Sequence, residues 1–93
     1  NEKNIYDILD KQLDELKKVM RKKEIIFDVS ENLKWHIVRK CDYFQYGART
    51  VRREIEKNIE DFIVEKLIYK EINFRKKILL DFDESNKKVI ISK

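Results

Sequence analysis

The residues best placed to do chemistry lie in one segment, Tyr46-Gly47-Ala48-Arg49-Thr50-Val51-Arg52-Arg53. It contains the only glycine of a 93-residue chain that has no proline, and it crowds three arginines around the expected start of a long helix. The N-terminal end of a helix carries about half a positive charge and normally attracts Asp and Glu, so arginines there oppose local stability. A bound anion such as a phosphate explains such an arrangement. The pattern therefore indicates an anion-binding site.

The long helix that carries these arginines has the strongest periodic pattern in the chain. Its apolar residues recur every three or four positions and predict one buried stripe about five turns long. They are Val51, Ile55, Ile59, Phe62, Ile63 and Leu67. The preceding residues, 41–46, follow neither a helical nor a strand period and are expected to form a loop, with the Tyr46 ring packed beneath it.

Two further helices are expected before this one. The first has Asn4 as its expected N-cap, followed by Asp7, and basic residues at its end. Its apolar stripe consists of Ile5, Leu9, Leu13, Leu16 and Met20. Ser30 is a favourable N-cap for the second helix, which Arg39 and Lys40 close.

Three segments have the features of strands. Residues 25–29 alternate with a period of two, and the apolar runs 78–82 and 89–91 flank a turn near Glu84-Ser85-Asn86. The predicted order is helix, strand, helix, long helix, strand, strand. This order predicts an α+β domain with three helices packed on a small three-stranded sheet.

Composition limits the size and setting of the protein. Charged residues make up 43% and hydrophobic residues 42% of the chain, and the net charge is a mild +4. At 93 residues the chain is expected to form a single domain, and because it begins at Asn1 with its one Met at position 20, we expect a domain excised from a longer chain. No apolar run approaches the ~20 residues that span a bilayer, so a soluble, intracellular protein is expected.

The single histidine and the single cysteine are not expected to be functional. His36 and Cys41 lie five positions apart, about 140° around a helix, so they do not share a face as metal ligands would. A nucleophilic cysteine also needs a neighbouring base, and the sequence suggests none. We therefore expect no catalytic residue and no metal site. One cysteine excludes an internal disulfide and fits a reducing compartment.

A series of residues in register resembles one protein family. The series is Ser30-Glu31, Tyr46-Gly47-Ala48-Arg49, Arg52, Arg53, Ile55, Ile59 and Asp61. It is similar to the C-terminal small domain of the Hsp100/Clp ATPases, the ClpB, ClpC and ClpA type of AAA+ unfoldase. The chain departs from that pattern at Thr50 and Phe62, where the family has proline, and at residues 41–44.

The resemblance implies a lid domain that works with a preceding AAA+ large domain. It implies that Arg49, placed by Gly47 and Ala48, is the sensor-2 arginine, which reaches the phosphates of an ATP bound mainly by the large domain, with Mg²⁺ in the parent protein. Arg52 and Arg53 would hold the lid to its neighbours, which include adjacent protomers of a hexameric ring. A ClpP-type protease is a further implied partner of the parent, and the cytosol, mitochondrial matrix and plastid stroma are the implied compartments.

Two other functions stay open from the residues themselves. One is an independent nucleic-acid-binding module that uses Arg49, Arg52 and Arg53 on phosphates, although the mild charge and the lack of base-stacking motifs count against it. The other is a protein-interaction domain that uses the hairpin or the first helix. A Gly-x-x-x-x-Gly-Lys-Ser/Thr phosphate loop is impossible with a single glycine. We therefore expect the domain by itself to be inactive as an enzyme.

Overall fold

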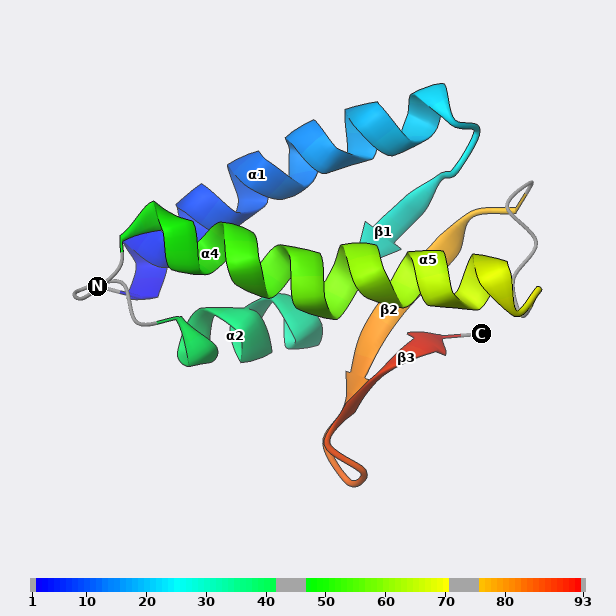
Figure 1. The fold of residues 1–93 in the computed structure, drawn as a ribbon. Helices are drawn as coiled ribbons and strands as arrows, with labels where there is room; N and C mark the ends of the chain where they lie inside the picture. Colours follow the sequence, from blue (N-terminus) through cyan, green and yellow to red (C-terminus); the bar gives the residue numbers. More distant parts are fainter. Residues whose placement is uncertain (1, 42–46, 71–75, 93) are drawn as a thin grey trace.

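The helices and strands follow the predicted order (Figure 1). The computed structural model describes residues 2–41, 47–70 and 76–92, so the predicted loop conformation at 42–46, with Tyr46, lies outside the described residues. The elements are α1 (Glu2–Lys22), β1 (Phe27–Val29), α2 (Glu31–Lys40), α4 (Ala48–Ile55), the π-helical segment η1 (Glu56–Glu60), α5 (Asp61–Ile68), β2 (Ile78–Asp83) and β3 (Lys88–Ser92). Because α4, η1 and α5 follow one another directly, they form a single long helix. Three helices and one three-stranded sheet confirm the predicted α+β class.

The sheet has the order β1-β2-β3 and is mixed. β1 pairs with β2 in parallel, with Phe27 opposite Ile78, and β2 pairs with β3 antiparallel, with Phe82 opposite Val89. Alternate residues of β2, namely Ile78, Leu80 and Phe82, are buried. The sheet therefore turns one face toward the helices, as expected for a small sheet with a single core side.

The core is apolar and joins all three helices to the sheet. No polar or charged side chain of the described residues is buried. The fully enclosed side chains are Leu9 and Leu13 from α1, Leu33, Ile37 and Val38 from α2, Val51, Ile59 and Ile63 from the long helix, and Leu80 from β2. The predicted stripes on the helices are thus confirmed, with Phe62 and Leu67 packed half-buried at the margin of the core.

The π-helical segment was not predicted, and the spacing of the buried residues gives its physical reason. Val51, Ile55, Ile59 and Ile63 recur every four positions. Four residues of an α-helix sweep about 400°, so a strict four-residue repeat drifts about 40° at each step. A turn with i→i+5 hydrogen bonds holds more residues and reduces this drift. The Asp61 N–H accordingly donates to the Glu56 carbonyl, which keeps Ile59 and Ile63 on the core side.

The start of α1 and the start of β1 differ from the sequence-based prediction. The predicted N-cap at Asn4 is wrong, because the helix already begins at Glu2, whose carboxylate suits the positive end of the helix. The predicted strand at 25–29 is shorter by two residues and starts at Phe27. The reason is that the Ile25 N–H donates to the Met20 carbonyl at 3.0 Å, so Ile25 is part of the turn that follows α1 and not of the strand.

The end of α1 has the hydrogen bonds of a Schellman motif. In addition to the bond from Ile25 to Met20, the Glu24 N–H donates to the Arg21 carbonyl at 2.9 Å. Met20 and Ile25 are both buried, which is the apolar contact that usually accompanies the motif. Glu24 occupies the left-handed position with φ 66°, where glycine is usual.

A serine links the second helix to the sheet. The Leu33 N–H donates to the Ser30 hydroxyl oxygen at 3.1 Å, which confirms the predicted N-cap. The Ser30 hydroxyl donates in turn to Asp81 Oδ1 at 2.6 Å, and the Phe82 N–H donates to the same oxygen at 2.8 Å. These hydrogen bonds, with that from Ser30 first, hold the pKa of Asp81 below its usual value.

Surface contacts tie α1 to α2. The Tyr6 hydroxyl donates to the Glu31 carboxylate at 2.6 Å, and the Tyr6 ring stacks on Trp35 with centroids 4.7 Å apart. Lys34 donates to Asp10 at 2.9 Å. Trp35 is therefore a half-buried residue of the α1–α2 contact.

Replacing Glu24 with Gly should stabilise the chain. Relief of the left-handed strain, roughly 1–2 kcal/mol, exceeds the entropic cost of a glycine, so a net gain of about 0.5 kcal/mol in the free energy of unfolding is expected. Urea denaturation measures it. The control is Lys18→Gly, at an exposed position inside α1, which should lose about 0.5–1 kcal/mol. A loss of stability in Glu24→Gly would contradict the Schellman assignment.

Replacing Ser30 with Ala should destabilise the chain in a pH-dependent way. Loss of the cap costs about 1 kcal/mol at any pH. The bond to Asp81 stabilises the ionised carboxylate, so its contribution is present above the unfolded pKa of about 3.9 and is lost as the pH falls through the lower folded value. Urea denaturation of wild type and variant should therefore differ more at pH 7 than at pH 3. Ser85→Ala, in the hairpin turn, is the control; an equal difference at both pH values for Ser30→Ala would refute the prediction.

Candidate functional site

The long helix starts at a residue whose backbone requires glycine. Gly47 has φ 63° and ψ −149° and makes no side-chain capping bond. This conformation is the mirror image of polyproline II, which only glycine adopts without strain. A Cβ built on Gly47 meets no atom of the described residues within 4 Å, so the constraint on this position lies in its backbone conformation. The Thr50 N–H donates to the Gly47 carbonyl at 3.1 Å and closes the first turn.

The arginines of the motif lie on the outside of this first part of the helix. Val51 is fully buried and fixes the rotation of α4, and Arg49, Arg52 and Arg53 are exposed. Within the described parts of the chain, neither Arg49 nor Arg53 forms an ion pair. Arg52 Nε lies 3.4 Å from Glu56 Oε1, one helical turn further along the chain. Because both of these side chains are more than half exposed, the pair contributes little to stability.

The electrostatics at this helix end favour an anion. The first turn of α4 contains no acidic residue, so nothing on the helix neutralises the positive end of its dipole. Ala48 is exposed and Gly47 half-buried, which leaves the backbone at the start of the helix accessible. Arg49 adds a permanent positive charge with a planar set of donors that match phosphate oxygens. The arrangement is suited to binding a phosphate group.

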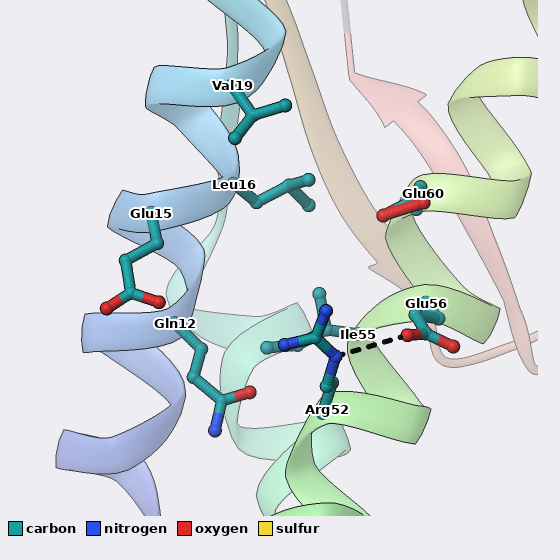
Figure 2. Close-up of a pocket in the computed structure, with 8 residues that line it drawn as sticks. All are labelled: Gln12, Glu15, Leu16, Val19, Arg52, Ile55, Glu56 and Glu60. Carbon is teal, nitrogen blue, oxygen red and sulfur yellow. Dashed lines mark hydrogen bonds and ion pairs between the residues drawn. The ribbon is translucent and has the colours of Figure 1, made fainter.

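A groove lies next to the arginines, between α1 and the long helix (Figure 2). Its volume is about 260 Å³. The lining residues are Gln12, Glu15, Leu16 and Val19 from α1, and Arg52, Ile55, Glu56 and Glu60 from the long helix. The floor is therefore apolar and the rim charged. Val19 is half exposed, at 50%, which marks this groove as a surface able to contact another protein surface.

The contacts of Cys41 and His36 are those of residues that stabilise the fold. Cys41 Sγ donates to the Ile37 carbonyl at 3.2 Å, and burial raises the pKa of the thiol to about 11. The thiol is therefore protonated at neutral pH and a poor nucleophile. The His36 ring stacks on Phe82 with centroids 3.6 Å apart, and burial lowers its pKa. Among residues 2–41, 47–70 and 76–92, no group of His, Cys, Asp and Glu side chains could hold a metal ion.

Comparison with known proteins identifies the family of this chain. A family model described as the C-terminal, D2-small domain of ClpB protein matches residues 1–80. The chain belongs to this Clp chaperone D2-small domain family.

Individual relatives agree with this assignment. The chain is 34% identical over 90 residues to a chloroplastic ClpA homolog from Brassica napus, described as an ATP-binding subunit of the ATP-dependent Clp protease. It is 33% identical over 90 residues to the chloroplastic chaperone protein ClpC1 of Arabidopsis thaliana, and 28% identical over 92 residues to the chaperone protein ClpB of Rickettsia conorii. These alignments cover 97%, 97% and 99% of the chain but only 10%, 9% and 11% of the relatives. The chain thus spans about a tenth of their length.

The structure places Gly47, Ala48 and Arg49, which are consecutive in the sequence, at the accessible start of α4. The groove between α1 and the long helix was not predicted. Its apolar floor was visible in the sequence only as Leu16, a member of the predicted stripe of the first helix, and the neighbouring Val19. Among the described residues, no helix has the length and apolar character needed to cross a membrane.

Replacing Gly47 with Ala should destabilise the chain by about 1–3 kcal/mol, because an L-residue is strained at this backbone conformation. Thermal and urea denaturation measure the loss. The control is D-alanine at position 47, introduced by chemical synthesis, which prefers φ 63° and ψ −149°. It should retain or increase stability. Equal losses for both alanines would mean that the added methyl group, and not the backbone, causes the effect.

Proposed function

We propose that this chain is the small, lid domain of a longer Clp/Hsp100 ATP-dependent protein unfoldase, and that Arg49 is its sensor-2 residue. In this role Arg49 reaches from the lid to the phosphates of an ATP bound mainly by a preceding AAA+ large domain. The observation that carries the proposal is an exposed Arg49 in the first turn of α4, without an ion pair among the described residues and preceded by a backbone conformation that requires glycine at position 47.

The chemistry of the nearby residues fits a shared ATP site. Arg49 supplies donors and charge for phosphate oxygens, and Gly47 and Ala48 leave the approach to the helix end open. The one glycine of the chain excludes a phosphate-binding loop, and the described residues offer no carboxylate cluster for Mg²⁺. We therefore assign most of the nucleotide site and the Mg²⁺ to the large domain, and expect the isolated lid to have no ATPase activity.

The groove of Figure 2 fits the contact between the lid and its neighbours. Arg52 lines this groove and lies three residues after Arg49, on an adjacent part of the same helix surface. A large domain that places its phosphate at Arg49 would also cover Leu16, Val19 and Arg52. We further propose that lid surfaces contact neighbouring protomers of a hexameric ring, so that rigid-body movement of the lid couples nucleotide state to ring geometry.

The relatives extend the proposal to the setting of the parent protein. Several are described as chloroplastic, and one as a subunit of the ATP-dependent Clp protease. These names favour a plastid stroma over the cytosol or mitochondrial matrix, and a ClpP-type protease as a further partner. The comparisons give no support to the alternative of an independent nucleic-acid-binding module.

Replacing Arg49 with Ala in the full-length parent tests the assignment. Loss of a charge-assisted hydrogen bond, worth about 1.5–3 kcal/mol, should reduce ATP turnover or nucleotide affinity by roughly ten- to a hundredfold. Steady-state ATP hydrolysis and binding of a fluorescent ATP analogue measure these effects. The matched control is Arg21→Ala, which removes the same charge at the far end of α1 (Figure 1) and should leave both unchanged.

Unchanged turnover and affinity in Arg49→Ala would refute the sensor-2 role. Thermal denaturation of the variant separates this outcome from a folding defect, since Arg49 is exposed and its loss should change stability little. Salt-sensitive binding of DNA or RNA by the 93-residue chain, lost in Arg49→Ala, would favour the nucleic-acid alternative instead.

A further inference from the structure

A different groove lies between the long helix and β3. Its volume is about 560 Å³, more than that of the groove between α1 and the long helix. One wall is formed by Lys57, Phe62 and Lys66 of the long helix, and the other by residues 88–91 of β3. In Figure 1, β3 is drawn below α5, close to the label of the C-terminus. The proposed nucleotide-sensing role makes no use of this groove.

The strand that forms one wall lies at the edge of the sheet. In the order β1-β2-β3, β3 has a partner strand on one side only. Half of the backbone N–H and C=O groups of an edge strand point away from the sheet and are able to pair with another strand. In the described part of the chain, no strand pairs with this edge of β3. The groove therefore combines a backbone edge with a helix beside it.

The floor of the groove is apolar. Val89 and Ile91 lie opposite the buried Phe82 and Leu80, so their side chains are on the core face of the sheet. They are half-buried, as is Phe62 on the helix. A strand added beside β3 would place every second side chain on this same face, against Phe62. Apolar side chains fit at those alternate positions.

The rim of the groove is basic. Lys57, Lys66 and Lys88 line it, and no carboxylate is found among the described residues that do so. The Lys66 ammonium lies 5.3 Å from the centroid of the Phe62 ring, so positive charge reaches the apolar floor. A segment that carries carboxylates on either side of its apolar residues would therefore be attracted to this groove.

We propose that the groove binds an extended, acidic peptide segment of another protein, which adds to the sheet as a fourth strand next to β3. Main-chain hydrogen bonds to the β3 edge hold the segment, apolar side chains pack on Phe62, Val89 and Ile91, and its carboxylates meet the lysines of the rim. Charge selects such a partner over a second copy of this chain. Pairing of two β3 edges would bring two basic grooves together, and like charges repel.

The test uses the 93-residue chain and a synthetic fluorescein-labelled peptide of sequence Asp-Asp-Val-Thr-Ile-Thr-Val-Asp-Asp, whose apolar side chains share one face and whose carboxylates flank them on both faces. Fluorescence anisotropy should show binding that weakens with salt, and a peptide with Lys in place of Asp should not bind. Amide resonances of residues 88–92 should shift in NMR spectra and become protected from hydrogen exchange. Absence of binding at millimolar peptide, or equal binding of the Lys peptide, would overturn the proposal.

Charge reversal in the groove gives a matched comparison. The double variant Lys57→Glu, Lys88→Glu should bind the acidic peptide at least about tenfold more weakly. Lys11→Glu, Lys18→Glu makes the same change of charge on the exposed surface of α1 and should bind as wild type. Circular dichroism confirms that both variants are folded. Equal weakening in the two variants would mean that net charge alone, and not the groove, attracts the peptide.

Backbone methylation separates strand addition from simple charge attraction. Two peptides are N-methylated, one at its odd and the other at its even residues. Only one edge of an added strand faces β3, so only one of the two peptides should lose affinity. Equal affinities of the two methylated peptides would overturn strand addition. None of these measurements involves ATP, so their outcome is independent of the Arg49 experiment.

Discussion

The four-residue repeat of Val51, Ile55, Ile59 and Ile63 is the contact on which the rest of the structure depends. The exposed fraction of each of these residues is 4% or less. They pack the long helix against the core that α1, α2 and β2 share. Their burial fixes the rotation of the helix about its own axis. With the buried side set, Arg49, Arg52 and Arg53 must lie outside, and η1 must supply residues to the grooves beside it. The position of every proposed functional residue therefore follows from this one apolar stripe.

The π-helical segment within that stripe also separates charge. Glu56 and Glu60 line the groove next to α1, and Lys57 and Asn58 line the groove next to β3. One groove therefore has a rim of mostly acidic residues, crossed by Arg52, and the other has a basic rim. No charged side chain of the described residues is buried, so all of their charged side chains lie at the surface. The two grooves accordingly favour partners of different charge.

The sequence predicted those features that depend on local period or local chemistry. The apolar stripes, the Ser30 cap, the hairpin and the exposed arginine motif all follow from residues near one another in the chain. The N-cap at Asn4 was predicted wrongly, since the helix begins at Glu2. The first strand was predicted too long, because the hydrogen bond from Ile25 to Met20 competes with the local pattern. The π segment was not predicted. The grooves could not be predicted, since each is formed by elements far apart in sequence.

The position of the single glycine distinguishes two kinds of backbone strain. Glu24, Lys70 and Lys87 have φ between 55° and 66° without being glycine, and a left-handed residue of this kind costs roughly 1–2 kcal/mol. Gly47 shares a similar φ, but its ψ of −149° places it outside the left-handed region. Residues with a side chain tolerate the left-handed conformation of Glu24, but they are strained in the conformation of Gly47. This holds even though a Cβ at position 47 would meet no atom of the described residues within 4 Å. Gly47 therefore allows the backbone conformation that precedes α4, and this conformation helps to position Arg49.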